Sequence, residues 1–216
     1  ILSNGSISGT AGVTVKAGAG VPIDLGSTTD SASRADLSDA ELDLITTSGT
    51  LQIGASDSGT ITISDAITRS ASTPITITSA SNIVFNPGSI DTAGGALTLT
   101  TVGAGSVQPI TTGMNATTSA TTAVSFGVGS KLGIAIAGNV EDTDYSPLNV
   151  AGKVNLNGTT LALSGAYVPT ISDSFVLVRN DGADAITGTF TGLAEGANLT
   201  VNGVSKQLTY VGGDGN

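Results

Sequence analysis

The sequence predicts an all-β chain that coils as a parallel β-helix, and three observations indicate this fold. The first is a series of short apolar triplets, each with a polar or small residue on either side. In each triplet the first and third side chains lie on one face, which is typical of a half-buried strand. Between residues 51 and 99 the triplets are Leu51–Ile53, Ile61–Ile63, Ile75–Ile77, Ile83–Phe85 and Leu97–Leu99.

The second observation is that the triplets recur at a longer period. The series are Leu51, Ile75 and Leu97 (spacings of 24 and 22 residues), Ile61 and Ile83 (22), and more weakly Ile67 and Ile90 (23). Three interleaved series that advance together are what a three-sided coil produces, with one coil per repeat. The sequence therefore predicts that the members of each series stack in register as columns.

The third observation is the composition. The 216 residues include 30 glycines, whereas only 11% are charged and 3% are aromatic. Threonine fits a pleated sheet, and glycine, serine and asparagine suit tight turns. The mean hydropathy of +0.29, together with the regular triplets, argues against a disordered low-complexity chain.

The N-terminal residues indicate a first coil that is followed by an interruption. Strands are expected over residues 6–8, 13–15 and 23–25. Residues 26–41 break the pattern and carry four carboxylates, Asp30, Asp36, Asp39 and Glu41. We expect a solvated insertion loop here, and the alternative is a ligand-facing loop or a loose Ca²⁺ site. Asp39 is suited to cap a short helical turn.

The second half of the chain has a different texture. We expect the coil to continue through residues 101–121, because Val107 and Ile110 fall near strand positions. From residue 122 the aromatic content rises, since all three tyrosines and three of the four phenylalanines lie there. Larger side chains suit a cap, because a solenoid end exposes unpaired backbone and an open core. We therefore divide the chain into β-helix coils over residues 1–120 and a β-rich C-terminal module over 121–216 that continues or caps the solenoid.

Strands in this second module are expected wherever the apolar alternation returns. The expected segments are 123–126, 132–136, 148–150, 154–156, 161–163, 175–178, 189–190, 199–201 and 207–210.

Several of these stretches resemble a known family. Residues 37–68 read LSDAELDLITTSGTLQIGASDSGTITISDAIT, and residues 75–101 read ITITSASNIVFNPGSIDTAGGALTLTT. Both resemble the repeats of large secreted bacterial adhesins of the filamentous-haemagglutinin type. Residues 144–165, DYSPLNVAGKVNLNGTTLALSG, resemble the C-terminal ends of autotransporter-like surface proteins. The resemblance implies a right-handed parallel β-helix that is exported across the bacterial outer membrane.

Charge and hydropathy exclude several classes of partner. The chain has 17 acidic and 7 basic residues, for a net charge of −10. It has no basic run that would attract nucleic acid, and no apolar run of the length that a membrane-spanning helix needs. It begins Ile1-Leu2-Ser3 without an initiator methionine, so we expect a segment of a longer protein.

The residue types argue against an enzyme. Histidine and cysteine are absent, which removes the commonest general base, thiol nucleophiles and most zinc sites. A carboxylate pair of the kind used by polysaccharide lyases or hydrolases is the remaining option, and Asp65 and Asp91 lie beside expected strands. We interpret both as corner residues of the coil, and we expect no catalytic site.

Calcium is the one cofactor that the sequence leaves open. Residues 212–216, Gly-Gly-Asp-Gly-Asn, match half of the nonapeptide of calcium-binding β-rolls and contain Asp214. Residues 141–144 form an acidic cluster that contains Asp142 and Asp144 but lacks the glycine and distal glutamate of an EF-hand loop. The simpler interpretation of both stretches is a solvated turn.

The sequence therefore predicts a structural or adhesive segment of a large secreted protein of the bacterial cell surface, acting as a stiff rod or filament subunit. The expected partners are other copies of the chain, flanking segments, and surface glycans or other host cell-surface components. The alternatives are a calcium-stabilised β-solenoid module and, less favoured, a polysaccharide-active enzyme.

Overall fold

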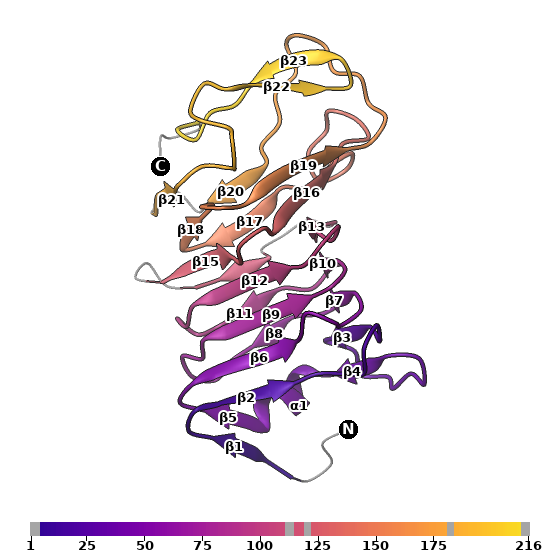
Figure 1. Ribbon diagram of the computed structural model, residues 1–216, viewed down its shortest axis with the longest axis vertical. Helices are drawn as coiled ribbons and strands as arrows, with labels where there is room; N and C mark the ends of the chain where they lie inside the picture. Colours follow the sequence, from indigo (N-terminus) through magenta and orange to yellow (C-terminus); the bar gives the residue numbers. More distant parts are fainter. Residues whose placement is uncertain (1–4, 111–114, 119–121, 181–183, 213–216) are drawn as a thin grey trace.

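In the computed structural model, which describes residues 5–110, 115–118, 122–180 and 184–212, short strands stack into an elongated column (Figure 1). This part of the chain is nearly all β, and its one helix is α1 (Asp39–Asp43). Most strands belong to three long sheets, and every pairing within those sheets is parallel. We call these sheets face 1, face 2 and face 3.

Each face is a ladder of strands that follow one another along the column. Face 1 contains β2 (Gly12–Val15), β6 (Thr50–Gly54), β9 (Ile75–Ser79), β12 (Leu97–Thr101), β15 (Ala123–Phe126), β18 (Lys153–Asn155) and β21 (Ile186–Thr187). Face 2 contains β4 (Ala35–Leu37), β3 (Ile23–Leu25), β7 (Ile61–Ile63), β10 (Ile83–Phe85), β13 (Val107–Pro109), β16 (Lys131–Ala135) and β19 (Thr160–Ser164). Face 3 contains β8 (Ile67–Thr68), β11 (Ile90–Asp91), β14 (Ala116–Thr117), β17 (Leu148–Ala151) and β20 (Val178–Asn180).

Two smaller sheets complete the described part of the chain. Strand β1 (Ile7–Gly9) pairs in parallel with β5 (Ile45–Thr47). At the other end of the column, β22 (Asn198–Val201) and β23 (Val204–Gln207) form an antiparallel hairpin.

The chain visits the three faces in turn, so that β6, β7 and β8 form one coil and β9 begins the next. The predicted columns are confirmed by the strand register. The observed partners are Leu51 with Ile75, Ile75 with Leu97, Ile61 with Ile83, and Ile67 with Ile90. This arrangement is consistent with the all-β parallel solenoid that the triplets predicted.

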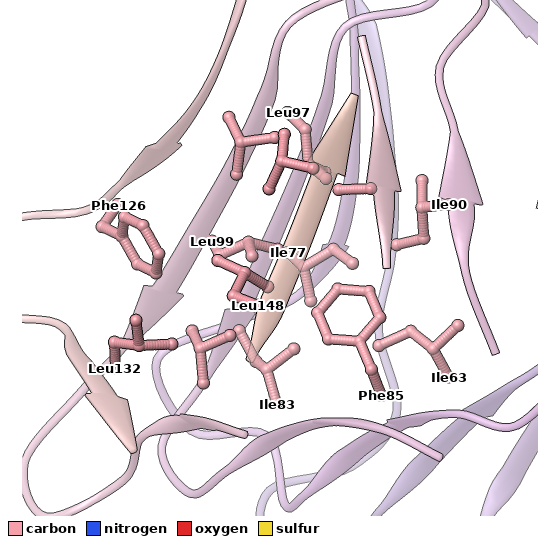
Figure 2. Close-up of a cluster of buried hydrophobic side chains, with 14 of the residues drawn as sticks. Ile63, Ile77, Ile83, Phe85, Ile90, Leu97, Leu99, Phe126, Leu132 and Leu148 are labelled. Carbon is pink, nitrogen blue, oxygen red and sulfur yellow. The ribbon is translucent and has the colours of Figure 1, made fainter. Parts of the chain in front are cut away.

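The core is a column of aliphatic side chains between the faces. Figure 2 shows Phe85 beside Ile63 and Ile77, and all three side chains are fully buried. Most of the polar side chains buried at the coil corners have hydrogen-bond partners, and within the described residues the Thr159 hydroxyl is an exception. At other corners, the Ser79 hydroxyl donates to the Gly59 carbonyl, and the Asn82 side-chain oxygen accepts from the Ser106 amide.

The expected insertion loop is correct only for residues 26–34. Strand β4 adds to the edge of face 2 beside β3, and α1 follows it. The helix has Ser38, and not Asp39, as its N-cap: the Glu41 amide donates to the Ser38 hydroxyl, while the Glu41 carboxylate accepts from the Ser38 amide. This reciprocal capping box stabilises a helix that is otherwise too short to form.

Helix α1 covers the edge of face 3, where β8 has no further parallel strand. The Thr68 amide donates to the Asp39 carboxylate. The Arg69 side chain is only 5% exposed, and its guanidinium donates to the carbonyls of Leu42 and Ile45. The short helix therefore replaces a missing strand, because its side chains and carbonyls pair with the groups that the edge leaves open.

Most strands of the second half form where they were expected, but three lie elsewhere. The observed strands are 178–180 in place of 175–178, 186–187 in place of 189–190, and 204–207 in place of 207–210. The last shift comes from the Asn202-Gly203 turn, in which both residues have positive φ, of 45° and 88°. Asn-Gly is the preferred sequence of a two-residue hairpin turn. Faces 1 and 3 continue from β12 to β15 and from β14 to β17, and the division of the chain at residue 120 stays a prediction.

Candidate functional site

Face 1 presents a regular array of uncharged polar side chains. The central outward column contains Gln52, Thr76, Thr98, Ser125 and Asn155, each the register partner of the next. A second column, two residues further along each strand, pairs Gly54 with Thr78 and Thr78 with Thr100. None of the residues of β2, β6, β9, β12 and β15 is charged. The surface is therefore flat, neutral and repetitive.

The hydroxyls of this array face solvent. Gln52 is tied to the sheet, because its side-chain amide donates to the Gly54 carbonyl and the Thr78 hydroxyl, each at 3.1 Å. Within the described part of the chain, the hydroxyls of Thr76, Thr98 and Ser125 have no protein partner, and all three residues are half-buried. They are therefore available to water or to a ligand.

A charged cluster lies at the N-terminal part of face 2. Asp24 on β3 and Asp36 on β4 are register partners, and Arg34 bridges them. Its Nη1 lies 3.1 Å from an Asp24 oxygen and its Nε 2.5 Å from an Asp36 oxygen. The carboxylates are 7% and 2% exposed and the arginine 38%. The Ser64 hydroxyl and the Ser31 amide donate to the remaining oxygens of Asp24 and Asp36, respectively.

The charged groups of this cluster pair with one another. Burial acts to raise the pKa of Asp36, but hydrogen bonds from the Ser31 amide and from Arg34 outweigh it and lower that pKa below its usual value. The hydrogen bond to Asp36 raises the pKa of Arg34. A carboxylate that is ionised and surrounded by donors is a poor general base. The hollow beside the cluster has a volume of about 280 Å³. We interpret the cluster as the fastening of β4 to β3.

Sequence reasoning missed this cluster, although a signal was present. Ile23-Asp24-Leu25 and Ala35-Asp36-Leu37 repeat the same pattern, with aspartate at the centre of a strand triplet. Two carboxylates at equivalent positions of neighbouring strands need a cation between them, and Arg34 is the adjacent one.

A cavity of about 620 Å³ lies between the last coil and the β22–β23 hairpin. Apolar and aromatic side chains form most of its lining, among them Leu163, Phe175, Leu177, Phe190, Leu199 and Tyr210. Phe175 packs edge-on against Tyr145 and Tyr167, with ring centroids 5.3 and 6.4 Å apart. The cavity is the loosely filled end of the apolar core.

Side-chain contacts fasten the segment that covers this end. The Lys206 ammonium donates to the carbonyls of Thr170 and Asp173, at 2.5 and 2.7 Å. The Asp173 carboxylate accepts from the Tyr167 hydroxyl, the Thr170 amide and the Asn139 side chain. These donors, Tyr167 first, lower the pKa of Asp173 to about 2.

Of the three aspartates considered for calcium, the structure describes Asp142 and Asp144, which lie in one turn. Asp214 lies outside the described residues. Asp144 closes a turn, in which its carboxylate accepts from the Val140 amide, and the Asp142 amide donates to the Tyr145 carbonyl. Among the residues that the structure describes, no group of three or more acidic side chains is placed to hold a metal ion. The calcium site stays a prediction.

Of the two aspartates considered for catalysis, Asp65 lies at a corner of the coil and Asp91 is the last residue of β11. The Asp65 carboxylate accepts from the Ala66 amide, and the Asp91 carboxylate accepts from the Ala93 amide. Ala93 has a positive φ of 51°, so the Asp91 contact supports a tight turn. Both contacts are local.

Comparison with known proteins identifies no relative: no family model, no curated protein and no solved structure matches this chain. In the part of the chain that the structure describes, no helix has the length and hydropathy needed to cross a membrane.

Proposed function

We propose that the chain is a structural and adhesive segment of a large secreted protein of the bacterial cell surface, as its resemblance to filamentous-haemagglutinin-type adhesins implies. The observation that carries the proposal is the in-register stacking of three long parallel sheets over a continuous aliphatic core. In this proposal the faces close into a right-handed parallel β-helix, since connections between parallel strands of this kind are right-handed in almost all proteins.

The mechanism is geometric. Each coil hydrogen-bonds to the coils before and after it, so the column lengthens by about 4.8 Å per coil and resists bending. The aliphatic columns hold the coils in register because a one-residue slip would expose the inward side chains. Such a rod holds many weak binding positions at fixed distances, and multivalent contact then gives useful affinity.

The proposed partners are other copies of the chain, flanking segments of a longer protein, and surface glycans or host surface components. Face 1 supports an adhesive role, because its neutral hydroxyl array is repeated from coil to coil. The proposed location is extracellular, at the bacterial surface.

Two measurements on the purified chain test the proposal. Small-angle X-ray scattering and negative-stain electron microscopy should show a rod, and a compact particle would contradict the structural part. Beads that carry many copies should bind glycan arrays or cell surfaces more strongly than the free chain does, by roughly 10²–10⁴-fold if contacts are multivalent. If the beads bind to none of these surfaces, the adhesive part is wrong and the structural part stands.

A further inference from the structure

Face 1 carries a two-dimensional grid of hydroxyl groups. Three consecutive coils contribute Thr76, Thr78, Thr98, Thr100 and Ser125. Neighbouring coils are separated by about 4.8 Å, and alternate residues along a parallel strand by about 6.6 Å. The hydroxyls therefore repeat in two directions on one flat face.

The grid is held rigidly. The residues that alternate with these threonines along β9 and β12 point inward and are almost fully buried, for example Ile77, Leu97 and Leu99. Parallel pairing fixes five successive residues of β9 against β12. Threonine is β-branched and has few accessible side-chain rotamers. Such hydroxyls lose little entropy when they bind an ordered partner.

The chemistry of the grid restricts the partner. The face 1 strands from β6 to β15 carry no charge, so a charged polymer finds no ion-pair partner there. Their single aromatic residue, Phe126, is buried, so the face offers no platform for stacking sugar rings. What remains is an alternation of threonine methyl and hydroxyl groups. A neutral lattice that consists only of hydrogen-bond donors and acceptors fits this surface.

Ice is a lattice of that kind. We propose that face 1, between β6 and β15, binds the surface of ice, an inference that rests on the adhesive rod proposed above and names one partner for it. The hydroxyls hold water molecules at repeated positions, and the methyl groups exclude water between them. The ordered waters then merge with the growing crystal. No bond is made or broken in the protein.

The test compares two matched tyrosine substitutions. Thr98→Tyr places a bulky side chain at the centre of the grid, whereas Thr68→Tyr places it at an exposed position of β8 on face 3. Tyrosine is well tolerated in strands, and circular dichroism with thermal melting checks that both variants fold. The readouts are thermal hysteresis, inhibition of ice recrystallisation, and partition of the protein into a growing ice hemisphere.

We expect the unmodified chain and Thr68→Tyr to enter the ice and to show hysteresis, and Thr98→Tyr to lose most of both. A folded, unmodified chain that is excluded from ice overturns the inference, as does an equal loss in the two variants. Binding to crystalline cellulose without binding to ice also overturns it. Scattering from the same samples separates the two proposals: a rod without ice binding removes only the ice partner, whereas a compact particle contradicts the rod itself.

Discussion

The regular coils between residues 51 and 101 and the C-terminal end between residues 165 and 212 are stabilised in different ways. In the coils, backbone pairing on both sides of every strand except the edge strand β8, together with a uniform aliphatic core, repeats from one turn to the next. At the C-terminal end, individual side chains make the connections. The Asn202 side-chain amide donates to the carbonyls of Gly165 and Tyr167, and the Tyr210 hydroxyl donates to the carbonyl of Leu193. The comparison shows that repetition supports the rod, whereas particular contacts close its end.

The largest effect should come from the core of the regular coils. Phe85 is fully buried, so Phe85→Ala should lower the free energy of unfolding by about 3–5 kcal/mol. Phe175 is half-buried at the C-terminal end, and Phe175→Ala should cost clearly less. Urea denaturation of the two variants measures the difference. Equal losses would contradict the distinction between a filled core and a loosely filled end.

The second prediction concerns the N-terminal part, where the regular coils meet α1. Arg69→Met removes two charge-assisted hydrogen bonds to the carbonyls of Leu42 and Ile45. We expect a loss of roughly 2–3 kcal/mol in the free energy of unfolding. Arg69→Lys is the control, because an ammonium keeps the charge but lacks the planar fork that reaches both carbonyls. If Lys and Met are equally harmful, the two-carbonyl geometry matters; if Met has no effect, α1 does not depend on this contact.

The sequence was sufficient to predict the register of the regular coils, because one pattern of apolar triplets repeats through them. Leu51, Ile75 and Leu97 could be placed in one column from spacing and alternation alone, as could Ile61 and Ile83, and the register confirms both. Any chain that buries every second residue of such triplets must stack them in this way, since a slip exposes the inward side chains.

The two ends of the column were harder to predict, because their contacts join residues far apart in the sequence and do not recur from coil to coil. Nothing local indicates that Arg69 reaches the carbonyls of Leu42 and Ile45, or that Lys206 reaches the segment near Asp173. The Asn202-Gly203 turn and the paired aspartate triplets were readable signals that the alternation pattern obscured. The grid on face 1 follows from the same alternation as the core, but its partner does not follow from sequence.

A smaller and more local effect is expected at the hairpin. Lys206→Met removes hydrogen bonds to the carbonyls of Thr170 and Asp173 while it keeps the apolar stem. The opening free energy of residues 166–177 should fall by about 1–2 kcal/mol. Hydrogen exchange should therefore speed up in this segment and stay unchanged between residues 51 and 101. Faster exchange throughout the coils would show that the end is not separable from the rod.

The smallest effect, and the most specific to the C-terminal end, is a response to acid. The pKa of Asp173 is about 2 in the folded chain, compared with 3.8 for a free aspartate, so the unfolded chain binds this proton more readily. The carboxylate therefore contributes its full stabilisation above about pH 4 and loses it as the pH falls toward 2. In Asp173→Asn this part of the acid response should be absent, so the melting temperature should fall less between pH 4 and pH 2 than it does in the unmodified chain. Asp57→Asn, at an exposed corner of the regular coils, is the charge-matched control and should keep the full response. If the two variants respond alike, the network of Tyr167, Thr170 and Asn139 around Asp173 does not stabilise the end of the rod.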